Sequence, residues 1–218
     1  MIDLTWPLDD RLLIYADGDY RDPPLARRAW CAIDERGFRV EELRLGTQTG
    51  THIDAPAHFD PAGATLDALP VERLIGSYCL IDLPARPAPI AHDYRGEAML
   101  FVRACGAVTR GGAADAAAPQ GSVTRGGGAA VLDPAQFEAL LALPPIVWVV
   151  AGVIEIDDAP RFEFHRALAH AGRYLVEDLE PAAALEVRPG GELFVLPLAL
   201  VGTSGAPCRV VVRPVDER

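Results

Sequence analysis

Residues 50–58 read GTHIDAPAH and hold two of the chain's five histidines in a stretch whose glycine and proline exclude a helix. Residues two apart in an extended chain point the same way, so His52 and Asp54 project together. An imidazole beside a carboxylate is a ligand pair suited to zinc, manganese or iron. Pro56, which has no N–H to donate, turns the chain and can bring His58 back toward the same space, where it could transfer a proton.

A surface loop with two chance histidines explains these nine residues equally well, because a catalytic metal generally has at least three protein ligands. The second half of the chain supplies further candidates. His165 and His170 lie in a predicted helix, and their spacing of five residues puts them on different faces, so one of them can be a ligand. Glu177 lies in an apolar segment, YLVEDL, and is either an exposed strand residue or a buried ligand.

The composition is that of a globular protein: 218 residues, 50% hydrophobic and 23% charged, with a net charge of -11. It predicts one domain over residues 1–218. The negative charge disfavours nucleic acid and anionic membranes as partners. The acidic N-terminus lacks a signal-peptide core, and the longest apolar runs, such as 144–154, are too short to cross a bilayer. Four scattered cysteines without a CxxC pair predict reduced thiols. We expect a cytoplasmic protein that acts on or binds a small molecule.

Many short apolar segments and a few helices predict an α/β or α+β fold. The expected strands are 2–5, 29–33, 38–44, 78–83, 98–103, 146–150, 193–200 and 208–213. The apolar runs at 146–150 and 208–213 are continuous, as in strands buried on both faces. Expected helices are 133–142, 163–172 and 180–185, of which the first begins with the strong start signal Asp133-Pro134.

Residues 106–128 are rich in glycine and alanine and contain VTRGG twice. This composition predicts a loop within the domain rather than a packed element. A lid over a site is the alternative, because long loops in compact domains often cover binding sites. A linker between domains is the weaker interpretation, since neither half of the chain looks complete.

Residues 48–58, QTGTHIDAPAH, resemble the HxGTHxDxPxH motif of the cyclase-like metal-dependent hydrolases, which include bacterial kynurenine formamidase and isatin hydrolase. The resemblance covers nearly the whole chain. IDLTWPL at 2–8 resembles the family's opening strand, and 179–212 resembles its closing segment. HRALAHAGRYLVEDL at 165–179 resembles the segment with the distal histidine and glutamate. The resemblance implies a swivelling β/β/α single domain with a mixed sheet or barrel-like β core, assembled as homodimers or homotetramers.

Matched residue by residue, the resemblance implies metal ligands at His52, Asp54, His165 and Glu177, and a catalytic histidine at His58. Asp54 and Glu177 could bridge two ions, so the expected cofactor is zinc or manganese, one or two ions. The implied activity is hydrolysis of a C–N amide, formamide or lactam bond in a small aromatic or cyclic molecule, as in an arylformamidase. A metal-dependent cyclase or dehydratase is the alternative on the same scaffold.

Gln48 departs from the motif, whose first residue is histidine. An amide oxygen is a weaker ligand for zinc than imidazole. Three outcomes are therefore open. Gln48 could bind through its oxygen and favour manganese, or the site could hold one ion instead of two. Alternatively, the protein has lost the metal and only binds a ligand. In the family an aromatic residue near the N-terminus packs on the substrate. Tyr15 lies near that place, with Trp6 and Tyr20 as neighbours that could serve. His92 and His170 match nothing in the motif, and we expect them to be structural or surface residues.

Overall fold

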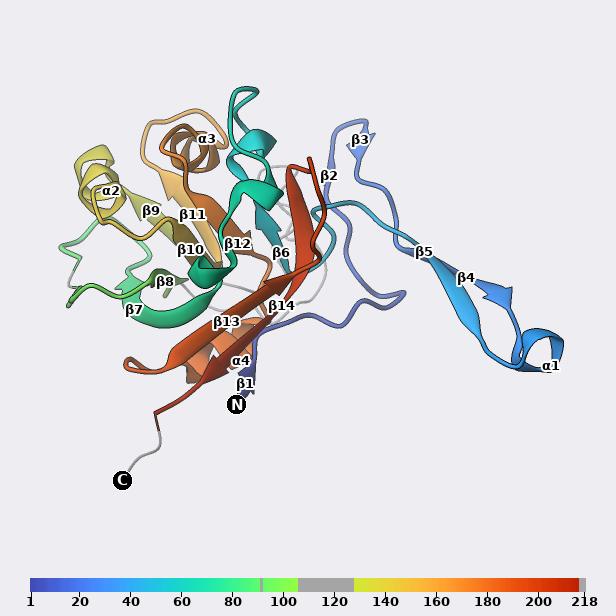
Figure 1. Cartoon of the computed structure of the whole chain (residues 1–218). Helices are drawn as coiled ribbons and strands as arrows, with labels where there is room; N and C mark the ends of the chain where they lie inside the picture. Colours follow the sequence, from blue (N-terminus) through green and yellow to red (C-terminus); the bar gives the residue numbers. More distant parts are fainter. Residues whose placement is uncertain (91, 106–127, 216–218) are drawn as a thin grey trace.

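The computed structural model describes residues 1–90, 92–105 and 128–215, and a ring of strands forms its centre (Figure 1). In order around the ring, the strands are β14 (Gly205–Arg213), β13 (Glu192–Pro197), β7 (Ile75–Leu83), β8 (Met99–Ala104), β10 (Val147–Ala151), β12 (Tyr174–Glu177) and β6 (His52–Asp54). One edge of β14 pairs with β13, and its other edge pairs with β6 and with the outer strand β1 (Ile2–Asp3), so the ring closes. The predicted α/β class with a barrel-like mixed sheet is confirmed.

The four strands β7, β8, β10 and β12 are parallel neighbours, whereas the remaining pairs of the ring are antiparallel. Every residue of β10 is buried. Val147 and Val149 belong to the core inside the ring, and Trp148 belongs to a second core between the sheet and the helices. This two-sided burial explains the continuous apolar run at 146–150.

The expectation of two-sided burial is wrong for residues 208–213. Along β14 the buried residues alternate with Arg209 and Arg213, which are exposed. The inner face of β14 packs in the core of the ring through Cys208, Val210 and Val212, and the residues between them point to the other face. Only these alternate residues therefore have to be apolar.

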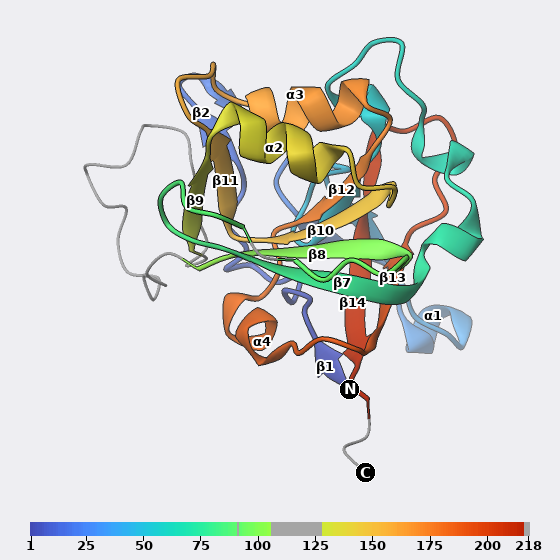
Figure 2. The same cartoon turned by 90° about the vertical axis from the view of Figure 1, so that its left-hand side faces the viewer.

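The three predicted helices are present: α2 (Pro134–Leu141), α3 (Glu163–His170) and α4 (Pro181–Glu186). Asp133 caps α2 by accepting a hydrogen bond from the backbone N–H of Gln136, and Glu180 caps α4 in the same way. Helices α2 and α3 lie on one side of the sheet and α4 on the other (Figure 2). None of the helices in the described ranges combines the length and hydropathy needed to cross a bilayer.

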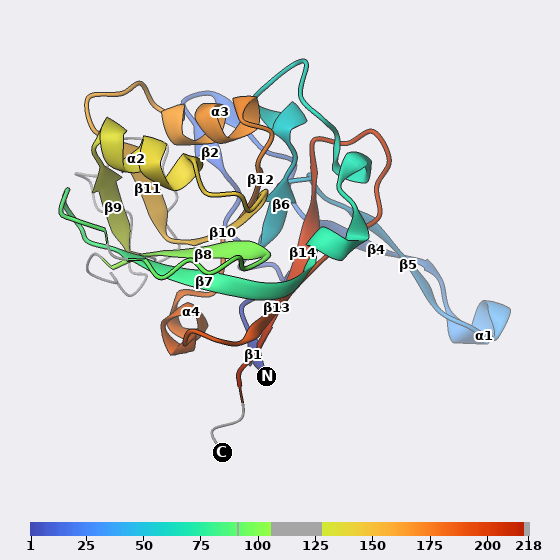
Figure 3. The ribbon, with the colours of Figure 1, turned by 60° about the vertical axis from the view of Figure 1, so that its left-hand side comes forward.

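Strands β4 (Ala26–Cys31) and β5 (Val40–Arg44) correspond to the predicted strands at 29–33 and 38–44. They leave the body as a two-stranded arm, residues 26–44, tipped by the short helix α1 (Ile33–Arg36) (Figure 3). Further short elements were not predicted: β2 (Ala16–Asp17), β3 (Tyr20–Arg21), β9 (Ala129–Leu132), β11 (Val153–Ile156) and the 3-10 turns η1 (Pro56–His58), η2 (Leu66–Ala68) and η3 (Val71–Arg73). The loop predicted at 106–128 lies outside the described residues except for Gly128.

Candidate metal centre

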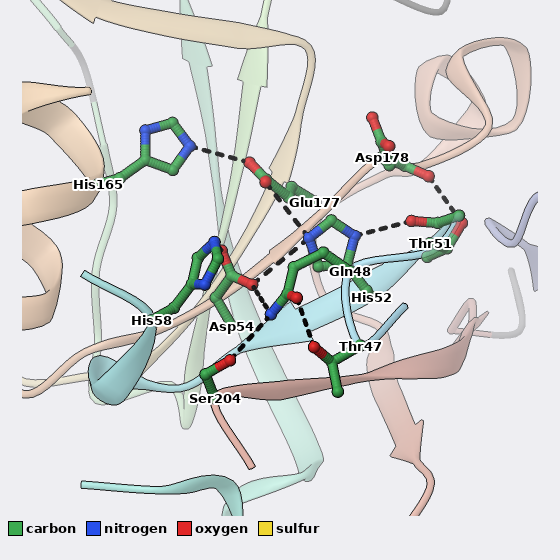
Figure 4. A network of polar contacts seen from close by, with 11 residues as sticks. Thr47, Gln48, Thr51, His52, Asp54, His58, His165, Glu177, Asp178 and Ser204 are labelled. Atoms are coloured by element: carbon green, nitrogen blue, oxygen red, sulfur yellow. Dashed lines mark hydrogen bonds and ion pairs between the residues drawn. The ribbon is translucent and has the colours of Figure 1, made fainter. Parts of the chain in front are cut away.

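Strand register brings the candidate ligands together. Strand β6 pairs with β12 so that His52 stands directly opposite Glu177. Directly opposed residues share a face of the sheet. Ile53, between the two candidate ligands of β6, belongs to the core inside the ring. His52, Asp54 and Glu177 therefore project from the outer face of the ring, next to α3 (Figure 4).

The three side chains converge closely enough to hold one ion. Their ligand atoms all lie within 4.8 Å of one another. His52 Nε2 is 3.4 Å from Asp54 Oδ1 and 3.4 Å from Glu177 Oε1. His52 Nδ1 donates a hydrogen bond of 2.7 Å to the carbonyl of Gly50, which fixes the ring and leaves Nε2 available as a ligand.

A divalent metal ion fits this set of residues. Within the described part of the chain, His52 Nε2 and Asp54 Oδ2 are buried without a hydrogen-bond partner. Leaving such a group unpaired costs about 1–3 kcal/mol. A bound cation would offset that cost, because all three groups present lone pairs. One imidazole with two carboxylates is also a donor set that suits zinc or manganese.

The remaining predicted residues surround these three. His165, on α3, has its Nε2 3.1 Å from Glu177 Oε2. His58, on η1, has its Nε2 4.0 Å from Asp54 Oδ2 and is one-third exposed. The sequence-derived candidates thus gather at one place, while His92 and His170 are exposed on the surface.

Gln48 also contacts the cluster, through its amide nitrogen. Gln48 Nε2 is 3.3 Å from Asp54 Oδ1, and the amide oxygen accepts a hydrogen bond of 2.5 Å from the hydroxyl of Thr47. Behind the cluster, the Thr51 hydroxyl donates to the carbonyl of Asp178 at 2.7 Å. Asp178 has a left-handed backbone with φ 57, and this bond helps hold the chain just after Glu177.

The titration behaviour of the cluster reflects its burial and its opposite charges. Burial alone lowers the pKa of His52, but the Asp54 and Glu177 carboxylates outweigh it and raise that pKa well above its usual value. The pKa of His165 is also raised, because Glu177 outweighs burial there. Burial opposes ionisation of Glu177, yet His165 and His52 hold the pKa of its carboxyl well below its usual range.

We expect the metal-free protein to lose stability as pH rises above about 6.5. The raised pKa values of His52 and His165 contribute stability that is fully present when the pH lies below the histidine pKa of the unfolded chain. This contribution is lost as the pH rises through the pKa values of the folded state. The lowered pKa of Glu177 contributes stability that is fully present above a pH of about 4.3. This contribution is lost as the pH falls through the pKa of Glu177 in the folded state. A metal ion binds only deprotonated imidazoles. The metal-loaded protein should therefore become more stable relative to the chelated protein as the pH rises.

Thermal unfolding of chelated and metal-loaded protein at pH 5.5 and 8 measures this effect. The difference in Tm between the two forms should be larger at pH 8. A difference that stays constant or shrinks between the two pH values would contradict the placement of the histidines in the metal centre.

A cavity of about 490 Å³ opens onto the cluster, and aromatic rings line it. The ring of Phe59 lies 5.8 Å from that of Phe162 and 5.1 Å from that of His165, measured between centroids. Tyr15 lines the same cavity, 6.4 Å from Phe162. Tyr20 lines it as well, whereas the indole N–H of Trp6 donates to the carbonyl of Leu179, so that ring links two segments of the chain.

Phe59, Phe162 and Arg161 are cavity residues that the sequence did not single out. Phe162 has a left-handed backbone, with φ 65, at the N-cap of α3. The Arg161 guanidinium donates to the Tyr15 hydroxyl at 2.7 Å, forms an ion pair with Asp17 and lies over the Phe162 ring. A signal was present, since Phe59 follows His58 directly and Phe162 precedes the candidate ligand on α3 by three residues, about one helical turn.

Comparisons by sequence and by structure show which known proteins this chain resembles. The model of the Cyclase family, described as "Putative cyclase", matches residues 2–118. The kynurenine formamidase of Salinibacter ruber is 30% identical over 193 residues, which cover 84% of each chain. Isatin hydrolase A from Labrenzia aggregata, solved with benzyl benzoate, has a TM-score of 0.71 at 20% identity and covers 97% of this chain and 92% of its own. A solved chain described as a potential metal-dependent hydrolase with cyclase activity has a TM-score of 0.60 at 21% identity and covers 97% of this chain and 98% of its own.

Proposed function

The chain belongs to the cyclase family, and from this premise we propose that it is a metal-dependent hydrolase of an aryl formamide, amide or lactam C–N bond. The observation that carries the proposal is the position of the His52, Asp54 and Glu177 cluster on an aromatic-lined cavity. Two kinds of relative support it: a kynurenine formamidase by sequence and isatin hydrolases by fold. The activity would be that of a hydrolase acting on C–N bonds other than peptide bonds.

We propose that His52, Asp54 and Glu177 hold a zinc or manganese ion and that His165 contributes through the second oxygen of Glu177 or as a further ligand. A bound divalent ion supplies Lewis acidity, which polarises a carbonyl and lowers the pKa of water. The orphaned atoms His52 Nε2 and Asp54 Oδ2 support this assignment.

We propose that His58 transfers the proton. Its Nε2 is 4.0 Å from Asp54 Oδ2, outside hydrogen-bond range, and its ring lines the cavity. We propose that Nε2 takes a proton from the attacking water as the new C–O bond forms. The same nitrogen then gives the proton to the leaving amine as the C–N bond breaks, which is general acid–base catalysis by one group. The imidazole and the Phe59 ring pack edge to face, with centroids 4.6 Å apart, and this contact restrains the orientation of the imidazole.

The aromatic rings define the substrate class. Phe59 lies next to His58 and Phe162, and Phe162 lies next to Tyr15, all on the same cavity. Flat apolar walls favour a planar aromatic group, stacked offset or edge-on. Such a substrate would place its formamide or lactam carbonyl toward His58 and its ring against Phe162.

Turnover of a substrate panel tests the proposal. Metal-loaded protein should hydrolyse aryl formamides or aromatic lactams. Absorbance detects the arylamine released from a formamide, or the free amino group of the ring-opened lactam. A chelator should abolish the activity, and added Zn²⁺ or Mn²⁺ should restore it. Absence of turnover on every such substrate at full metal occupancy would contradict the proposal.

We further propose that the protein assembles as a homodimer or homotetramer through the arm, residues 26–44. Four large hydrophobic residues of the arm are 58–66% exposed: Trp30, Ile33, Phe38 and Leu43. A two-stranded hairpin alone is marginally stable in water. The arm has five arginines and four acidic residues, a net charge of +1, whereas the whole chain has -11. A second copy, whose remainder has the opposite sign of charge, therefore complements the arm.

Replacing Trp30 and Leu43 with glutamate should convert the oligomer to monomers, because the charges would have to be desolvated in the interface. Sedimentation velocity measures the change. Val71→Glu is the matched control, since Val71 is 66% exposed on η3, outside the arm. A monomeric wild-type protein, or an oligomer that survives both arm substitutions, would contradict assembly through the arm.

A further inference from the structure

We infer that Gln48 is a positioning residue that holds Asp54 through its amide nitrogen and does not ligate the metal; this rests on the proposed metal site. Gln48 Nε2 is 3.3 Å from Asp54 Oδ1 and 3.5 Å from the hydroxyl oxygen of Ser204. Through Gln48, these contacts connect the segment before β6, the strand β6 itself and the residue that precedes β14 (Figure 4).

The amide oxygen of Gln48 already has a partner on the other side. It accepts a hydrogen bond of 2.5 Å from the Thr47 hydroxyl. Turning the amide over would place this oxygen against Asp54 Oδ1, so two acceptors would face each other. It would also leave the Thr47 hydroxyl facing an NH₂ group. The amide nitrogen carries two hydrogens and offers no lone pair to a metal, so in this orientation Gln48 presents only a hydrogen-bond donor to the cluster.

The backbone of β14 makes room for this orientation. A Cβ atom added at Gly205 would lie 2.7 Å from Gln48 Nε2 and 2.5 Å from the carbonyl oxygen of Ile53. A side chain at Gly205 would displace the amide from the carboxylate. Glycine at this position is therefore a steric requirement for the contact between Gln48 and Asp54.

Holding Asp54 Oδ1 has a consequence for the metal centre. His52 Nε2 lies 3.4 Å from the same oxygen, and Asp54 Oδ2 is buried without a hydrogen-bond partner. Gln48 thus fixes the rotation of the carboxylate relative to the imidazole before any ion binds. Groups that orient ligands in this way typically change metal affinity by about 10–100-fold when they are removed.

Titration with Co²⁺ in the absence of substrate tests the inference, because the visible absorption of bound Co²⁺ reports its direct ligands. Gln48→Leu should raise the Kd by about 10–100-fold. The saturated Gln48→Leu protein should keep the band positions and intensities of the wild type. Thr47→Val should raise the Kd by a smaller factor, because the amide loses the partner that orients it. Gln136→Leu, on α2, is the matched control and should leave the Kd unchanged.

Three outcomes would overturn the inference. A saturated spectrum that changes in Gln48→Leu would show that the amide oxygen is a direct ligand. Unchanged Kd values in both Gln48→Leu and Thr47→Val would show that Gln48 does not position Asp54. Wild-type protein that binds no Co²⁺ would contradict both this inference and the proposed metal-dependent function, whereas the first two outcomes leave the proposed function intact.

Discussion

Asp54→Asn and His52→Ala should each strip or strongly weaken the bound metal and abolish the hydrolysis that depends on it. Both residues are 4% exposed, and their ligand atoms lie within 4.8 Å of those of Glu177. Asparagine keeps the shape of aspartate but loses the charge, and it can turn an NH₂ group toward the ion. Alanine at 52 removes the only imidazole among the three convergent groups of the described chain.

The same substitutions should lower thermal stability in the presence of metal. An ion that binds only the folded state stabilises it by about 2.7 kcal/mol at a hundredfold excess over its Kd. Loss of the site should therefore lower the Tm measured in the presence of metal. It should also remove most of the difference in Tm between the loaded and the chelated protein. Metal content by mass spectrometry and Tm by calorimetry measure the two effects. Glu155→Gln is the control, since Glu155 lines the cavity outside the three-residue cluster. Full metal content in both variants would refute the site.

His58→Ala should reduce turnover by about 10²–10⁴-fold, the usual contribution of a positioned acid–base group. Metal content should stay close to that of the wild type, because His58 Nε2 is 4.0 Å from Asp54 Oδ2 and lies outside the cluster of convergent ligand atoms. Substrate affinity should change less than kcat, since the ring of Phe59 remains.

Steady-state kinetics and metal analysis of the same preparation separate these effects. His170→Ala serves as the control, because His170 is exposed at the end of α3 and contacts none of the cluster. A His58→Ala protein that loses its metal together with its activity would make His58 a ligand instead of a proton carrier.

Local sequence patterns predicted those features of the site and the fold that depend on neighbouring residues. The period of two along β6 places His52 and Asp54 on one face, and the structure has them there. The Asp133-Pro134 start signal located α2 because capping depends on neighbouring residues only. The continuous run at 146–150 indicated two-sided burial, which β10 shows.

Long-range pairing explains what local sequence patterns could not place; only the family resemblance indicated Glu177 as a partner of His52. Glu177 meets His52 because β12 and β6 pair in one register, although more than a hundred residues separate them, and no local pattern specifies that register. Burial of 208–213 was overestimated for the same reason, since the neighbours of β14 depend on how the ring closes. The left-handed conformation of Phe162 also depends on tertiary context, because a bulky residue there is disfavoured locally.

An anomalous-scattering map of metal-loaded crystals tests whether His52, Asp54 and Glu177 form the metal centre. We expect a peak about 2.0–2.2 Å from His52 Nε2 and from carboxylate oxygens of Asp54 and Glu177. The map should also show the Gln48 amide nitrogen toward Asp54, with no bond from its oxygen to the peak. A fully loaded crystal whose peak lies elsewhere, or that shows no peak at these three residues, would contradict the claim that they form the metal centre.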